Sequence, residues 1–282
     1  MISKEKFFQG IFAFCAIIST LAVGMICIFL FGNAIPTIHE IGFIHFIFGM
    51  DWYPTEGIFG IFPMIVGSIY VTALAIFIGV PIGVLSAIYL SAFCPKKLKK
   101  YIMPAVELLG AIPSVVYGFF GLVVVVPILA DIFSGIPGKS VLAASIILAI
   151  MILPTIILVS KAALDSVPKS YCEGALALGA SKERSVFFAS LPAAKSGILS
   201  SIILGVGRAI GEAMAVIMVA GNQVQIPESV LDGVRTLTTN IVLEMGYATD
   251  LHKEVLIANA VVLFVFILLI NACFNALKRE VK

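Results

Sequence analysis

The sequence contains six long apolar stretches. A helix needs roughly 20 apolar residues to cross about 30 Å of hydrocarbon, and six stretches are long enough. They cover residues 7–31, about 64–93 and 197–221, and they lie between Glu107 and Asp131, between Lys139 and Lys161, and between Glu254 and Lys278. This pattern predicts an all-α integral membrane protein with six transmembrane helices.

The composition supports the same class. Of the 282 residues, 61% are apolar and 12% are charged, whereas soluble domains are about 45–50% apolar and about 25% charged. This excludes a water-soluble enzyme domain and a disordered chain. The net charge of +2 gives no sign of a nucleic-acid surface.

Basic residues gather on one face of the predicted membrane domain. Short loops rich in Lys and Arg stay in the cytoplasm, and the opposite loops hold only Lys139, Arg235 and Lys253. Both termini are therefore predicted to be cytoplasmic in a multi-pass protein of the cell membrane. The fourteen residues on the basic face are Lys4, Lys6, Lys96, Lys97, Lys99, Lys100, Lys161, Lys169, Lys182, Arg184, Lys195, Lys278, Arg279 and Lys282.

The first apolar run argues against a cleaved signal sequence. It has 25 residues, and the apolar region of a secretory signal has about 7–15. We therefore expect an uncleaved first span.

A fragment of a nucleotide-binding motif occurs near Lys139. The pattern G-x-x-x-x-G-K-[ST] fits Gly138, Lys139 and Ser140, but its first glycine falls on Phe133. A Pro-Gly turn between two spans is the better interpretation. The chain is predicted neither to hydrolyse ATP alone nor to bind a cofactor.

The first outer loop contains two histidines and two carboxylates, but their spacing does not fit H-E-x-x-H. The cysteine spacings match no zinc motif either. We expect a solvated loop with Trp52 and Tyr53 as interfacial anchors, no metal site and no catalytic residues. A membrane-embedded enzyme or assembly factor, the rival from another class, would need such residues. The loop residues concerned are His39, Glu40, His45 and Asp51.

The segment 161–195 is patterned unlike a flexible connector. Pro168 suits a helix start, Gly179 a helix end, and Ser181 a second N-cap before Leu191 and Pro192. A helix over about 169–178 is predicted. Such a hairpin lies on the membrane surface or docks into a cytoplasmic partner.

This segment resembles the EAA loop of binding-protein-dependent ABC importer permeases. The resemblance implies a type I permease fold and a coupling helix that enters a cleft on the ATPase. Gly174 stands where Ala is typical, and Ala189 stands where Ile often precedes Leu-Pro. The matching coupling-loop positions are Glu173, Gly174, Ala175, Gly179, Leu191 and Pro192.

Four further motifs resemble the phosphate-specific permeases of this superfamily, and the likeness covers about residues 64–277. It implies an importer of inorganic phosphate that contains a homologous second permease, an ATPase dimer that uses ATP, and an external phosphate-binding protein. Ala213 replaces an expected Thr, and a molybdate or sulfate permease is the alternative. The motifs occupy 111–118, 207–216, 234–238 and 243–248.

The resemblance divides the chain into three parts. Residues 1–63 form the first span and an outer loop, 64–277 form the permease core with five spans, and 278–282 form a cytoplasmic tail. In the outer region, apolar residues at helical spacing predict an amphipathic or re-entrant helix over 229–245. The binding protein is expected on that side.

Arg208 and Glu212 are the charges within the fifth span. They are four residues apart, so on a continuous helix they could neutralise each other. Alternatively they form a polar step on the substrate path, because the guanidinium fork suits phosphate oxygens. The small residues around them, Gly205, Gly207 and Gly211, suit close helix packing or a cavity wall equally.

Overall fold

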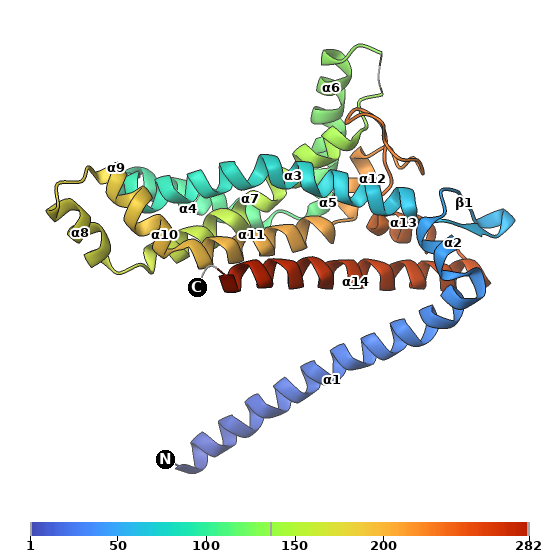
Figure 1. The fold of residues 1–282 in the computed structure, drawn as a ribbon, viewed down its shortest axis with the longest axis horizontal. Coiled ribbons are helices and arrows are strands. Elements are labelled where there is room, and N and C mark those ends of the chain that lie inside the picture. Colours follow the sequence, from blue (N-terminus) through green and yellow to red (C-terminus); the bar gives the residue numbers. More distant parts are fainter. Residues whose placement is uncertain (1, 136, 281–282) are drawn as a thin grey trace.

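The protein is an elongated helical bundle (Figure 1). The computed structural model describes residues 2–135 and 137–280, with side-chain surroundings for 7–135, 137–274 and 276. α3 (Phe62–Ile88), α7 (Val141–Asp165), α11 (Lys195–Ile210) and α14 (Asp250–Glu280) run along its length. The terminal charges Lys4, Lys6, Lys278, Arg279 and Lys282 lie outside the described side chains.

Five helical segments among the described residues are long and apolar enough to cross a membrane. A bent pair, Lys182–Ala193 and Lys195–Ile210, meets at 70° and would provide a sixth. The predicted all-α membrane fold is therefore confirmed. The five segments are Phe7–Ile41, Phe62–Phe93, Ser114–Ile132, Val141–Asp165 and Asp250–Phe274.

α7 forms the centre of the bundle, packed between α3 and α11. Ile156 of α7 is fully buried and occupies the space left by two glycines on the neighbouring helices. A Cβ on Gly83 would lie 2.7 Å from Ile156 Cγ2, and a Cβ on Gly205 would lie 3.1 Å from Ile156 Cγ1. The small residues at these positions permit close helix packing.

The third predicted span is confirmed as Ser114–Ile132, and a helix that the sequence analysis did not predict precedes it. A helix, α4 (Lys96–Ala111), starts within the lysine cluster that follows α3 and its terminal π-turn η2 (Tyr89–Phe93). The chain bends at Ile112 and Pro113 because proline disfavours helical backbone in the residue before it. It continues as α5 (Ser114–Phe120), η3 (Gly121–Val125) and α6 (Val126–Ile132).

The fifth predicted span is not one helix. α11 ends at Ile210, and α12 (Met214–Val219) begins after a non-helical segment at 211–213. The expected helix over 229–245 is also wrong in its first half. Only α13 (Leu237–Glu244) is helical there, capped by the hydroxyl of Thr236. The preceding segment instead forms a parallel bridge between Gly221 and Val234.

The first outer loop is more ordered than a solvated connector. α1 (Ile2–Ile41) and α2 (Phe43–Phe48) lead into an antiparallel hairpin of β1 (Trp52–Tyr53) and β2 (Ile58–Phe59), joined by η1 (Pro54–Glu56). Trp52 is buried, 6% exposed, and packs against Phe59. The expectation that Trp52 anchors at the lipid interface is therefore wrong, whereas Tyr53 is 55% exposed.

α1 stands apart from the bundle over most of its length and meets α14 near the outer hairpin (Figure 1). The start of α1 and the end of α14 lie at the end of the molecule that carries the segment 161–195. This arrangement agrees with an even number of crossings.

Candidate functional site

Arg208 lies beside a proline-containing turn of α7 and close to the bend between α4 and α5. Arg208 lies thirteen residues into α11, in its last turn, so it is about 20 Å from the start of that helix. Its Nη1 donates a hydrogen bond to Oγ1 of Thr155, 3.2 Å away. Thr155 follows Pro154, which lies within α7, and Gly110 of the α4–α5 bend approaches that proline.

The buried Tyr117 stabilises the bend between α4 and α5. Tyr117 is 5% exposed, and its hydroxyl donates to the carbonyl of Leu109 over 2.7 Å. This bond ties the first turn of α5 back to the last turn of α4, beside Pro154. The motif 111–118 therefore contributes the bend that lies next to Arg208.

Arg208 and Glu212 do not form an ion pair. The ion pairs among described residues involve Lys161 with Asp165, and Glu244 with Arg235 and His252. The (i, i+4) geometry expected for Arg208 and Glu212 requires a continuous helix, and the helix is interrupted at 211–213.

Glu212 instead serves the start of α12. Its Oε1 accepts a hydrogen bond from the backbone N–H of Ala215 over 3.0 Å. Its own carbonyl accepts from the hydroxyl of Thr238, also at 3.0 Å. A small cavity of about 10 Å³ lies between Glu212, Thr236, Thr238, Ser68 and neighbouring apolar residues. Both bonds satisfy backbone groups that the break exposes.

The glycines near Arg208 have separate roles. Gly205 is buried against Ile156, whereas a Cβ at Gly207 would meet no atom within 4 Å. Gly211 ends the helix, and a Cβ there would be 3.4 Å from the Gly207 carbonyl oxygen. One glycine therefore serves packing, and Gly207 leaves the surface beside Arg208 open.

The segment 161–195 forms the predicted helical hairpin. α8 (Lys169–Ala177) is followed by Gly179, whose φ is +86°, and by α9 (Lys182–Ser185). The hydroxyl of Ser181 caps α9 by accepting from the N–H of Arg184. The chain continues through η4 (Val186–Ser190) and α10 (Leu191–Ala193) into α11. The predicted helix, glycine bend and cap are confirmed.

The hairpin is cross-linked by hydrogen bonds and presents an open outer surface. Oγ of Ser185 donates to the carbonyl of Cys172 over 3.2 Å, and the Cys172 thiol lies 2.8 Å from Oγ of Ser190. Leu178 at the bend is 91% exposed, and Phe188 is 78% exposed. The apolar side chains at the bend are therefore free to contact another protein.

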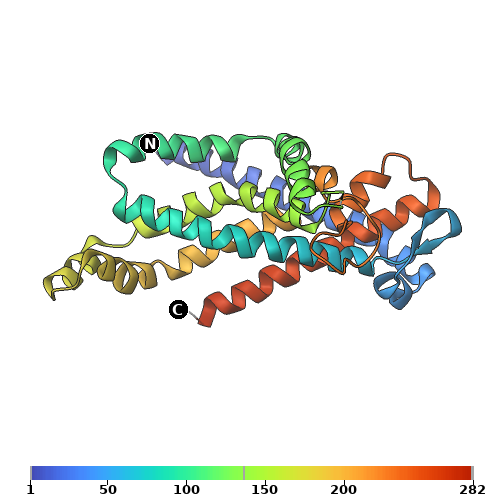
Figure 2. The same ribbon diagram turned by 90° about the horizontal axis from the view of Figure 1, so that it is seen from above.

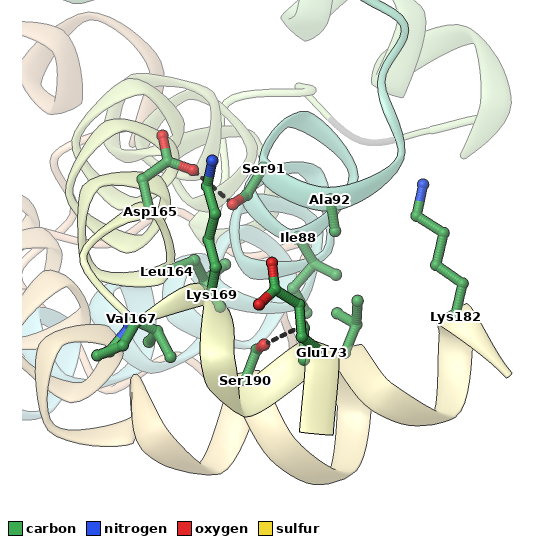
Figure 3. A pocket seen from close by; sticks show the side chains of 13 residues that line it. Ile88, Ser91, Ala92, Leu164, Asp165, Val167, Lys169, Glu173, Lys182 and Ser190 are labelled. Carbon is green, nitrogen blue, oxygen red and sulfur yellow. Dashed lines mark hydrogen bonds between the residues drawn. The ribbon is translucent and has the colours of Figure 1, made fainter. Parts of the chain in front are cut away.

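A groove of about 600 Å³ separates this hairpin from the ends of α3 and α7. Figure 3 shows Lys169 and Glu173 projecting from the hairpin toward Asp165 and Ser91, whereas Lys182 lies apart from that pair. Oδ1 of Asp165 accepts a hydrogen bond from the Ser91 hydroxyl over 2.6 Å. The hairpin thus meets the membrane helices through an incompletely filled junction that contains polar residues beside an apolar cluster of Ile88, Leu164 and Val186.

Residues 79–282 match the family described as "Binding-protein-dependent transport system inner membrane component". The chain belongs to this family. The positions that resemble an EAA loop fall on the helical hairpin: Glu173, Gly174 and Ala175 lie on α8, Gly179 forms the bend, and Leu191 and Pro192 begin α10. A Cβ at Gly174 would meet nothing within 4 Å, so the departure from Ala leaves the fold of the loop unchanged.

Named relatives agree with this family. "Probable ABC transporter permease protein YqgH" of Bacillus subtilis is 41% identical over 91% of this chain and 86% of that protein. "Phosphate transport system permease protein PstC" of Mesorhizobium japonicum is 35% identical, covering 91% of this chain and 84% of its own length. The PstC protein of Haemophilus influenzae is 35% identical over 76% and 74%.

Solved structures show the same fold. A chain of the alginate ABC importer matches with a TM-score of 0.64 and 17% identity, covering 98% of this chain and 99% of that one. A chain of the inward-facing MetNI methionine ABC transporter matches with a TM-score of 0.62 and 20% identity, covering 82% and 100%. The permease fold therefore extends over nearly the whole chain.

A second polar cluster, at the end of the bundle that carries the β1–β2 hairpin, escaped the sequence analysis. Glu244 is 5% exposed, and its Oε1 accepts from Arg235 Nη1 over 2.6 Å. Its Oε2 accepts from Trp52 Nε1 at 2.9 Å and lies 2.8 Å from His252 Nε2. This cluster joins the outer hairpin, the segment before α13, and α14.

Arg235 makes two further hydrogen bonds. Nε donates to the carbonyl of Asn222 and Nη1 to Oδ1 of Asn240, each over 3.1 Å. Partial burial and the Glu244 carboxylate raise the pKa of Tyr247, and the Arg235 guanidinium partly offsets this. Arg235 and Glu244 fall in the motifs 234–238 and 243–248. These motifs were the sequence feature from which the cluster could have been found.

Proposed function

We propose that this chain is the transmembrane permease subunit of an ATP-driven importer of inorganic phosphate. One observation carries the assignment to an anion: the Arg208 guanidinium, inside the helical bundle, contacts a neutral threonine hydroxyl and is paired with no carboxylate of the described residues. Arg208 is partly buried, and a cation within the bundle that has no counter-charge is unfavourable unless an anion visits it. The relatives named for phosphate transport support phosphate over molybdate or sulfate.

Arg208 and Glu212 have different roles on this path. Arg208 supplies a permanent positive charge and several N–H donors for phosphate oxygens, with Thr155 holding one end of the guanidinium. Glu212 fixes the start of α12 through one oxygen. Its other oxygen is available to accept a hydrogen bond from a protonated phosphate.

The hairpin from α8 to α10 couples transport to ATP hydrolysis in a partner. The exposed bend at Leu178 and Gly179 enters the cytoplasmic ATPase dimer, which binds and hydrolyses ATP. The incomplete packing in the groove beneath Glu173 lets the hairpin move relative to α3 and α7. Movement of the hairpin shifts the permease between inward-open and outward-open states.

Two further partners complete the importer. A homologous second permease forms the other wall of the path, and an extracytoplasmic phosphate-binding protein delivers the anion at the outer hairpin. The excess of basic residues places the termini and the α8–α10 hairpin in the cytoplasm. The partner ATPase supplies the energy. The segment around Lys139 does not complete a phosphate-binding loop, because Phe133 stands where that motif requires its first glycine.

The direct test is uptake of labelled anions by cells that lack this chain. Restoring the wild-type chain should restore phosphate uptake, while sulfate and molybdate uptake stay at background. Restored uptake of sulfate or molybdate instead of phosphate would replace the proposed substrate. No restored uptake of any of the three would reject oxyanion import.

A further inference from the structure

α4 carries an isolated carboxylate, Glu107, at membrane depth. The helix runs alongside α7 rather than across the end of the bundle (Figure 2). Val106 packs in one cluster with Ile157, and a Cβ on Gly110 would lie 3.3 Å from Pro154 Cβ. These α7 residues precede the end of that helix by eight and eleven positions, so Glu107 lies roughly 12–16 Å inside that end.

Glu107 has no partner among the residues that the structure describes. It is exposed, and no hydrogen bond or ion pair of the described residues involves it. The nearest cation preceding it on α4, Lys100, is seven residues away, about 10 Å along the axis. An ionised carboxylate facing lipid at this depth is unfavourable, so it requires water or a cation.

The exposed face of α4 has the pattern of a helix-packing surface. Tyr101, Ala105 and Leu108 recur at positions i, i+4 and i+7, and Tyr101 and Leu108 are 74% and 68% exposed. Glu107 flanks this stripe. Apolar residues at this spacing with a charge beside them are typical of helix pairs joined by interhelical ion pairs, and the small Ala105 permits close approach.

The stripe is not needed for packing within the chain. The other side of α4, through Ile102, Met103 and Val106, already packs near Leu90 and Ile157. The surface containing Tyr101, Ala105, Glu107 and Leu108 is therefore open to a partner in the membrane.

We infer that α4 packs against a helix of the second permease, and that this helix presents a Lys or Arg side chain to Glu107. The inference rests on the proposed function, which supplies the second permease. Charge complementarity decides the occupant: a lipid tail offers no cation to an ionised carboxylate at this depth, whereas a helix of the second permease can present one. The ion pair fixes the register of the two subunits within the membrane.

The first measurement is retention of the second permease when the complex is purified in detergent. Glu107→Leu should lower the ratio of second permease to this chain by at least about tenfold, because it strands the partner's cation. Glu107→Gln should give an intermediate loss. Glu56→Leu, an exposed carboxylate in the outer hairpin, is the matched control and should retain the partner.

The second measurement keeps Glu107 and probes the surface directly. Leu108 is replaced by the photoreactive p-benzoylphenylalanine, and the membranes are irradiated. The second permease should be the main adduct. Adducts with phospholipid alone, or full partner retention by Glu107→Leu, would overturn the inference.

These readouts do not depend on the transported substrate. If wild-type complex fails to import phosphate but the two subunits cross-link at position 108, the proposed substrate fails and the interface stands. If phosphate import is normal and position 108 labels only lipid, the interface fails and the proposed function stands.

Discussion

Two arginines of this permease lie within polar surroundings but are held in opposite ways. Arg235, at the outer end, pairs with the buried Glu244 and also donates to Asn222 and Asn240. Arg208, in the last turn of α11, has one hydrogen bond to Thr155 among the described residues and no carboxylate partner. The protein holds the first guanidinium with three hydrogen bonds and an ion pair, and it holds the second with a single hydrogen bond.

This difference separates a structural charge from a charge that can act on a substrate. An arginine paired with a buried carboxylate stabilises the elements that it joins, here α13 and the backbone at Asn222. An arginine with free donors can bind an anion without first breaking internal bonds. The break after Ile210 creates this state, since it turns Glu212 away from Arg208 and toward the N–H of Ala215.

The largest expected effect is on stability at the outer cluster. Arg235→Met leaves Glu244 buried without its main counter-charge, which costs about 3–5 kcal/mol. The purified complex should unfold at a much lower temperature, and less protein should accumulate in the membrane. The double change Arg235→Met with Glu244→Leu should recover part of the loss. Equal stability of the single variant and wild type would contradict the structural role of Arg235.

The next effect concerns the coupling between ATP hydrolysis in the partner and anion transport through this chain. Gly179 adopts φ +86°, and this conformation is costly for a β-branched residue, so Gly179→Val should distort the bend. Stimulation of ATP hydrolysis by loaded binding protein should fall several-fold, while Arg208 remains intact. Gly174→Ala is the control, because a Cβ there meets no atom. Normal coupling in Gly179→Val would reject the docking role.

The smallest expected effect tests how Arg208 is positioned. Thr155→Val removes the hydroxyl while keeping the side-chain shape, and one hydrogen bond to a charged group contributes about 1.5–3 kcal/mol. The phosphate concentration for half-maximal uptake should rise about tenfold or more, with the amount of assembled complex unchanged. Thr155→Ser keeps the hydroxyl and should transport nearly normally. A Thr155→Val variant with wild-type phosphate affinity would remove Thr155 from the site.

The sequence predicted those parts of the molecule that depend on local pattern. Apolar length placed the membrane helices, and Pro168, Gly179 and Ser181 placed the hairpin and its bend, because helix starts, left-handed turns and caps depend on single residues. Arg208 and Glu212 stood out because charges are rare within apolar spans.

Features that depend on tertiary contacts were not accessible. Hydropathy cannot reveal the break at 211–213, since the flanking residues are apolar on both sides. Trp52 looked like an interfacial anchor, yet a carboxylate 192 positions away accepts its N–H. The sequence analysis did not predict α4. This helix contains four lysines and Glu107, and charged residues mark the ends of apolar spans. Nothing in the sequence marked Thr155 as a site residue except its position directly after Pro154.

The central claim is that Arg208 serves the anion rather than the fold. Its most direct test is phosphate uptake by the complete importer, reconstituted in vesicles with ATP inside, with Arg208→Met in this chain. Since Arg208 pairs with no carboxylate here, we predict that the variant assembles with its partner subunits and remains as heat-stable as wild type. Uptake should fall to background, and Arg208→Lys should recover only part of it, because lysine keeps the charge without the planar fork. Near-normal phosphate uptake by the assembled Arg208→Met complex would contradict the account.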